Sequence, residues 1–131
     1  MRLLAAGLIL ALAGCATMEQ KPPNLMGDWG GPHAAVTLEG GLGQAQFDCA
    51  SGTIDKAIIP GPDGHFSVSG MYMEGQRGPI RVGQIFKSQR ATYTGEIAAQ
   101  QMILRVALED GTVLGPFTLT ENAPPQLTRC L

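Results

Sequence analysis

The 131-residue sequence has few charged side chains, few aromatic ones and, after residue 12, no long hydrophobic run. Asp, Glu, Lys and Arg make up 15% of the chain and aromatic residues 5%. The formal net charge of −2 excludes the basic surface that general nucleic-acid binding requires. Scarce aromatic residues disfavour an extensive stacking platform for bases or sugars. A hydrophobic fraction of 44% argues against disorder, and the length allows one domain.

Motifs for catalysis and cofactor binding are also missing. The sequence contains no glycine-rich phosphate loop and no G-x-S-x-G nucleophile motif. His33 and His65 are the only histidines, and alternation places both on polar strand faces as solvated side chains. Asp48 and Asp55 illustrate a carboxylate pair that can meet across a hairpin, but exposed positions beside Lys56 are the simpler interpretation. We therefore expect no enzyme activity, no catalytic residues, no metal and no cofactor.

The first fifteen residues have the features of a secretion signal. A positive start at Met1-Arg2 precedes an apolar run over residues 3–12, which is too short to cross a hydrocarbon core of roughly 30 Å. The run ends in Leu12-Ala13-Gly14-Cys15, which resembles the lipobox of bacterial lipoprotein signal peptides. An ordinary secretory signal with a chance cysteine is the alternative.

The lipobox resemblance implies cleavage after residue 14, with Cys15 as the first mature residue, carrying diacylglycerol and palmitate. Ala16, rather than Asp, at the next position implies sorting to the outer membrane, with the protein facing the periplasm. Residues 1–14 are then the signal peptide, 15–26 a lipidated tether and 27–131 the folded domain. Loss of Arg2 leaves eight basic against 11 acidic residues, a net charge of −3.

With Cys15 acylated, Cys49 and Cys130 form an even pair in an oxidising compartment. We expect a disulfide between them, which closes a loop of about 80 residues. Two buried free thiols, or a metal-binding pair, are the alternatives.

After residue 30 the dominant hydrophobic period is two, which indicates strands. We expect about eight, near residues 33–39, 43–50, 53–59, 65–72, 80–86, 90–97, 101–109 and 112–120, with a last short run at 127–131. Within 112–120 the alternation places Val113, Gly115, Phe117 and Leu119 on the apolar face. Gly70, Gly95 and Gly115 lie inside expected strands, where they relieve curvature.

The fold predicted from this pattern is all-β: a small antiparallel up-and-down barrel of about eight strands, because closure removes unpaired edges. A β-sandwich is the alternative. The apolar inner face indicates a filled or narrow interior. Gly27-Asp28-Trp29 is similar to the G-x-W motif that opens lipocalin and other calycin barrels. That resemblance implies that Trp29 closes one barrel end and packs against a basic residue late in the chain, here Arg129.

A second resemblance covers nearly the whole mature domain. Trp29-Gly30-Gly31, Phe47-Asp48-Cys49-Ala50, Phe117-Thr118-Leu119 and Arg129-Cys130-Leu131 resemble segments of a set of uncharacterised small bacterial envelope proteins. It implies no activity, because none is assigned to that set.

The segment from residue 77 to 90 is unusual, since Arg77, Arg81, Lys87 and Arg90 occur in it without an acidic residue. Such a segment fits lipid phosphates, lipopolysaccharide, peptidoglycan carboxylates or an acidic protein. A solvated loop and strand face is the alternative. Met71 and Met73, expected opposite Tyr72, extend it as an adaptable apolar rim.

These observations predict a non-enzymatic envelope module, held to the membrane by its lipid, which binds an envelope lipid, peptidoglycan or a protein. One alternative is a periplasmic lysozyme inhibitor. The run from Phe47 to Gly52 and the late cysteine resemble those lipoproteins, although the chain has no S-G-x-x-Y motif. A small-ligand carrier of calycin type is the other alternative, and it requires a cavity.

Overall fold

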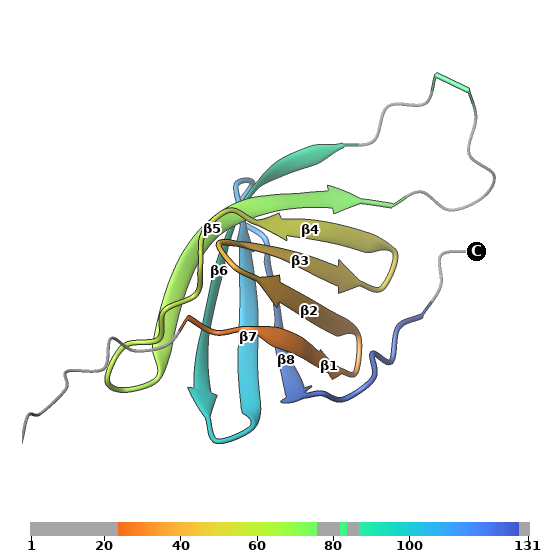
Figure 1. Cartoon of the computed structure of the whole chain (residues 1–131). Helices are drawn as coiled ribbons and strands as arrows, with labels where there is room; N and C mark the ends of the chain where they lie inside the picture. The colour runs from red at the N-terminus through yellow and green to blue at the C-terminus, as the bar shows by residue number, and fades with distance from the viewer. Residues whose placement is uncertain (1–23, 76–81, 84–86, 129–131) are drawn as a thin grey trace, which may run out of the picture.

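The computed structural model describes residues 24–75, 82–83 and 87–128, which form a closed antiparallel β-barrel (Figure 1). Its eight strands follow chain order: β1 (Gly27–Gly31), β2 (Ala34–Glu39), β3 (Leu42–Phe47), β4 (Ala50–Ile54), β5 (His65–Glu74), β6 (Ser88–Ala98), β7 (Gln101–Leu108) and β8 (Val113–Glu121). The barrel closes where Trp29 and Gly30 of β1 pair with β8. The predicted up-and-down barrel is therefore confirmed, and the sandwich alternative is wrong. No helix among these residues is long and apolar enough to span a bilayer.

The barrel has two ends, which we name after a residue in a turn at each. The Gly40 end holds the turns at 40–41 and 99–100 and the loop 55–64. The Asp48 end holds the turns at 32–33, 48–49 and 109–112. Residues 24–26 enter the barrel at the Gly40 end, whereas the chain after β8 runs back to the Asp48 end, on the right of Figure 1.

Most of the expected strands exist, with shifted limits. Gly27–Gly31, which we placed before the first strand, is β1 itself. The strand expected at 53–59 ends at Ile54 because the following loop crosses the Gly40 end and buries Ile58 there. Of the strand expected at 80–86, residues 82–83 form a turn and the others lie outside the described residues. Of the run at 127–131, residues 127–128 are not in a strand and the remainder is likewise outside.

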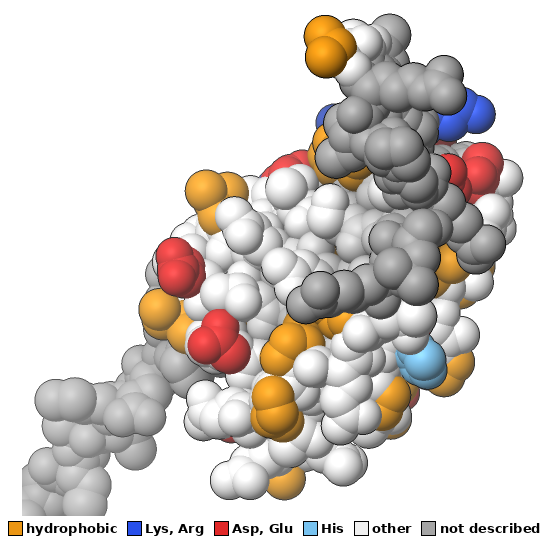
Figure 2. Space-filling view, turned by 90° about the vertical axis from the view of Figure 1, so that its right-hand side faces the viewer, with side chains coloured by type: hydrophobic (Ala, Val, Ile, Leu, Met, Phe, Trp, Pro, Cys, Tyr) orange, Lys and Arg blue, Asp and Glu red, His pale blue; other side chains and the backbone are white. Residues whose placement is uncertain are grey.

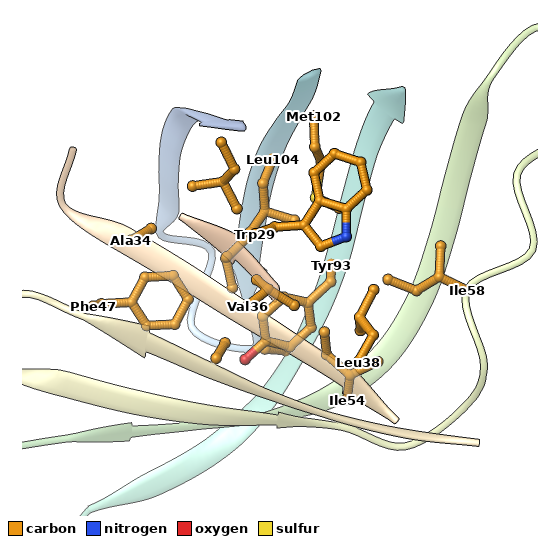
Figure 3. Packing of buried hydrophobic residues seen from close by; sticks show 14 of the residues in the cluster. Trp29, Ala34, Val36, Leu38, Phe47, Ile54, Ile58, Tyr93, Met102 and Leu104 are labelled. Atoms are coloured by element: carbon orange, nitrogen blue, oxygen red, sulfur yellow. The ribbon is translucent and has the colours of Figure 1, made fainter. Parts of the chain in front are cut away.

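The interior is filled by apolar side chains that point inward from every second strand position (Figure 3). Seventeen hydrophobic side chains are buried, and among the described residues no buried residue is polar or charged. Tyr93, Met102, Leu104 and Ile54 are among the largest of those that are fully buried. Period-two patterning thus places the apolar set of each strand on the inner face, as expected for a sheet with one dry face.

Tyr93 packs across the middle of the barrel, and two glycines make room for it. Its hydroxyl donates a hydrogen bond to the backbone carbonyl of Met71, 2.7 Å away. A Cβ at Gly52 would collide with the Tyr93 hydroxyl, and a Cβ at Gly70 with the Thr53 carbonyl and the Tyr93 ring. Burial raises the pKa of the Tyr93 hydroxyl far above its usual value. These glycines therefore have a packing role that is more specific than relief of curvature.

The apolar face predicted for the last strand is wrong in its first half. Val113 is 61% exposed, whereas Leu114 packs against the core. The cause is a register shift: Leu104 pairs with Phe117, but Val106 pairs with Leu114, so β8 has one extra residue. Such a bulge reverses the side-chain alternation on one side of it. Gly115, at φ +100°, lies within this irregularity.

Candidate functional site

The basic segment is only partly described, and its described part is mixed in charge. Arg77 and Arg81 lie outside the described residues. Lys87 and Arg90 are exposed. Each lies beside an acidic residue of a neighbouring segment, because the Lys87 carbonyl accepts a hydrogen bond from the Glu74 amide at 3.2 Å and the Arg90 carbonyl accepts one from the Glu109 amide at 3.0 Å. Near the top of Figure 2, basic side chains (blue) lie beside acidic ones (red). The described end of this stretch, which has no acidic residue along the chain, is thus flanked by acidic residues in the fold.

Asp110 belongs to the same neighbourhood. Its pKa is held below the usual value, first by the backbone amide of Thr112 and less by Gln89 and the charge of Lys87. The carboxylate therefore reduces the local positive potential near Lys87. The anion-binding role of Arg77, Arg81, Lys87 and Arg90 stays a prediction.

Met71, Tyr72 and Met73 take the alternate faces that were predicted. Met73 is 41% exposed and Met71 is half-buried, while Tyr72 points inward. The Tyr72 ring contacts the Phe47 ring at a centroid distance of 5.6 Å, and Phe47 contacts Phe117 at 5.5 Å. The three rings close the core toward the Asp48 end.

Both histidines are exposed, as expected, but neither is a simple solvated side chain. The Nδ1 atom of His33 lies 2.5 Å from Oδ2 of Asp48. His65 lies 3.1 Å from Asp63 and 3.7 Å from Glu96 at the opposite barrel end. The described part of the chain contains no group of three or more His, Cys, Asp or Glu side chains that could hold a metal.

Asp48 and Asp55 do not meet. Asp48 lies in the turn before β4 and Asp55 follows the other end of that strand. The hypothetical carboxylate pair is therefore wrong, and the structure instead engages Asp48 in a clamp on the C-terminal chain.

This clamp joins three segments at the Asp48 end. Oδ1 of Asp48 accepts a hydrogen bond from the backbone amide of Thr128, at 2.7 Å, while Oδ2 contacts His33. The Thr128 amide, and then His33, lower the pKa of Asp48 below its usual value. His33 adopts φ 69°, a left-handed turn conformation that brings its ring to Asp48.

Cys49 follows Asp48 directly and is disulfide-bonded. Cys130 lies outside the described residues, so its pairing with Cys49 stays a prediction. The clamp supports that pairing, because Cys130 follows Thr128 by two residues, a chain length of about 7 Å.

Residues 122–128, which we call the strap, run back along the outside of β1. The backbone amide of Asn122 bonds to the carbonyl of Asp28 at 2.7 Å, and Gln126 exchanges backbone hydrogen bonds with Gly31 and His33. Gly30 lies under the strap, where a Cβ would collide with the Ala123 carbonyl. The absence of a side chain at Gly30 thus lets the strap lie close to the barrel wall.

A groove lies beside the strap on the outer face of the sheet. Its first part, of about 390 Å³, is lined by strap residues 122–125 and by the outer faces of β1, β2 and β3. Its second part, of about 490 Å³, continues over β3 and β4 toward the Gly40 end. The two parts share Thr37 and Gln44, so we treat them as one strap groove.

A row of polar side chains crosses the floor of the strap groove. Asp28 pairs with Thr37, Thr37 with Gln44, and Gln44 with Thr53, all on the outer face. Four adjacent strands spaced about 4.8 Å apart make this row roughly 14 Å long. Gln46 and Ala35 form part of the next row. In the part of the chain that the structure describes, no Lys or Arg lines either part of the groove.

The sequence interpretation missed the strap groove. Period two does place Gln44 and Gln46 on the outer face, but polar side chains on a strand usually indicate only solvent. Their alignment depends on the register of four strands and on the path of the strap. The alternation of apolar and polar residues within one strand predicts neither of these.

Trp29 is 3% exposed and its ring points into the barrel (Figure 3). Its indole Nε1 donates a hydrogen bond to the carbonyl of Met26, 3.3 Å away, and Leu25 is bonded through its amide to Ile58. These contacts support the expectation that Trp29 helps to close the Gly40 end. The predicted partner Arg129 lies outside the described residues, so the cation–π contact stays a prediction.

In comparisons with known proteins, no family model, curated protein or solved structure matches this chain. The fold is therefore taken from the structure, and function is argued from the site geometry alone.

Proposed function

We propose that this chain is a lipid-anchored, non-enzymatic binding or accessory module that faces the periplasm from a bacterial outer membrane. The observation that carries the binding role is the division of the barrel: its interior is filled with apolar side chains, while the strap groove lies outside. A filled interior favours an outer binding surface over a calycin-type carrier cavity. The outer surface of β1–β4 and the strap is then the binding surface.

The direction of the tether supports an orientation for the module. The described chain begins beside Ile58, since the amide of Leu25 bonds to the Ile58 carbonyl at 2.8 Å. A lipid on Cys15 is therefore joined to the barrel at its Gly40 end, which favours an arrangement in which the Asp48 end, with the clamp, lies farther from the membrane. Nine residues, from Ala16 to Asn24, precede this contact and allow a reach of up to about 32 Å.

Replacing Cys15 with serine tests the anchor. The wild-type chain is expected in the membrane pellet after cell fractionation, because the attached acyl chains bury in lipid. The Cys15→Ser chain is expected in the soluble fraction or as an uncleaved precursor, without incorporated palmitate. Equal membrane association and equal palmitate incorporation in both chains would contradict the lipid anchor.

Binding is tested with the unlipidated chain, residues 16–131, in a thermal-shift screen. The panel holds phospholipid vesicles, lipopolysaccharide, peptidoglycan fragments and lysozyme. A ligand that binds only the folded state raises the melting temperature with its concentration, and we expect this for one class in the panel. No shift with any class, together with no binding of the neutral saccharide titrated below, contradicts the binding role.

Paired variants locate the surface that binds. Gln44→Ala with Gln46→Ala removes two side chains from the strap groove, and Lys87→Ala with Arg90→Ala removes the two described basic residues of the 77–90 segment. We expect the first pair to abolish the thermal shift and the second to preserve it. The reverse result assigns binding to the basic segment, and a shift with lysozyme alone selects the inhibitor alternative.

A further inference from the structure

The strap groove has a lining that restricts the chemistry of its occupant. Its uncharged polar groups are the side-chain amides of Gln44, Gln46 and Asn122 and the hydroxyls of Thr37 and Thr53. Each of these groups both donates and accepts hydrogen bonds. A ligand that satisfies them along the whole row must offer many groups that also donate and accept.

Charge excludes one broad class of ligand. Asp28, Glu39 and Asp55 line the groove, and among the described residues no Lys or Arg side chain does. Within the described chain, the three carboxylates have no ion-pair partner, since the ion pairs found involve only the two histidines. An anionic ligand in the groove would meet like charges without compensation. Lipid phosphates and polyuronates therefore fit poorly, whereas uncharged ligands fit.

The groove also has apolar surface between its polar groups. Ala35 and the strap prolines Pro124 and Pro125 line the first part, and Leu42, which is 67% exposed, lines the second. A pyranose ring has the same mixture, because its C–H groups are apolar and its substituents are hydroxyl or acetamido groups. Trp29 is the one aromatic residue among the described residues of the lining, and its ring points inward, so none of these residues offers a ring for stacking.

We propose that the strap groove binds an uncharged polysaccharide chain that carries hydroxyl and acetamido groups, lying across β1–β4 along the row from Asp28 to Thr53. The inference rests on the proposed binding role and names its ligand class. Recognition comes from hydrogen bonds to the amide and hydroxyl row, with the strap prolines and Leu42 against the C–H faces of the sugars. Without stacking, the affinity is modest, with a Kd near 1 mM or somewhat below.

The test is an NMR titration of the isotope-labelled unlipidated chain, residues 16–131, with three hexasaccharides of different charge. Chitohexaose is neutral, a hexamer of glucosamine is cationic and hexagalacturonate is anionic. We expect chitohexaose to shift the backbone amides of Thr37, Gln44 and Thr53 in a saturable way. Hexagalacturonate is expected to cause no shifts there.

The variants carry a matched control. Gln44→Ala with Gln46→Ala is expected to weaken chitohexaose binding by about tenfold, because two bidentate groups are lost. Gln101→Ala removes an exposed glutamine at the start of β7, outside the groove, and is expected to leave the Kd unchanged. Melting temperatures of all variants show whether each remains folded.

Any one of four outcomes overturns the inference. These outcomes are binding of hexagalacturonate as tight as that of chitohexaose, binding of the glucosamine hexamer alone, equal effects of the groove and control variants, and no saturable shift with chitohexaose up to about 10 mM. If chitohexaose fails while another class in the thermal-shift screen binds, the saccharide assignment is wrong and the binding role stands. If both fail, the binding role itself is wrong.

Discussion

Replacing Tyr93 with alanine is expected to lower the free energy of unfolding by about 3–5 kcal/mol. The side chain is fully buried at the centre of the barrel, so its loss leaves a cavity between opposite walls. The change also leaves the Met71 carbonyl without its 2.7 Å hydrogen bond from the hydroxyl. Urea unfolding, followed by circular dichroism, measures the difference.

Two further variants separate packing from hydrogen bonding. Tyr93→Phe keeps the ring and is expected to cost about 1 kcal/mol for the lost hydrogen bond. Thr92→Ala, at the exposed neighbouring position, is expected to change stability by less than about 0.5 kcal/mol. A loss below about 1 kcal/mol for Tyr93→Ala would show that the core does not depend on this ring.

Gly52 gives an independent check on the same contact. A Cβ at this position would collide with the Tyr93 hydroxyl and approach the Met71 carbonyl to 2.7 Å. Gly52→Ala is therefore expected to cost less stability in the Tyr93→Phe background than in the wild type, since one collision is removed. Additive effects of the two changes would argue against the packing described here.

Local pattern was sufficient to predict the fold class because the barrel has one apolar and one polar face. In a strand such as Leu42–Phe47, each inward residue is apolar or glycine, and Gln44 and Gln46 point outward. Turn residues at 40–41 and 110–111 separated the strands correctly. Closure of the sheet into a barrel was predicted from the number of strands, because closure leaves no strand edge unpaired.

Other parts of the fold depend on tertiary contacts that the pattern does not contain. β1 has the sequence Gly27-Asp28-Trp29-Gly30-Gly31, which has poor strand propensity. It forms because β2 pairs along its length, β8 closes against it and the strap requires a bare Gly30. The bulge in β8 is equally hidden, since one extra residue opposite Arg105 exposes Val113 and turns Leu114 inward.

The candidate site was predictable only in part. The sequence indicated that Cys49 forms a disulfide bond and that both histidines are exposed. It did not indicate that His33, Asp48 and Thr128 meet from three segments that are distant along the chain. The basic segment looked unusual because acidic residues are absent along it. Glu74 and Glu109 reach its described part through strand pairing, which a linear search cannot reveal.

Loss of the proposed Cys49–Cys130 disulfide is expected to lower the free energy of unfolding by about 4 kcal/mol. The bond closes a loop of about 80 residues, which contains the five strands β4–β8, and so restricts the unfolded chain more than a short loop would. In the unlipidated chain, residues 16–131, a thiol assay should find no free thiol before reduction and two after it. Two free thiols in the folded, unreduced protein would contradict the bond.

Single and double substitutions test whether these two cysteines pair with each other. Cys49→Ser, Cys130→Ser and the double variant should lose the same stability, because each removes the same bond. A loss with Cys49→Ser but not with Cys130→Ser would show that Cys49 has another partner. Since the Asp48 carboxylate holds Thr128 independently of the sulfur atoms, Asp48→Ala in the double variant should release the strap further. Amide hydrogen exchange at Gln126 and Thr128 measures that release, and unchanged exchange would mean that the clamp contributes nothing once the disulfide is gone.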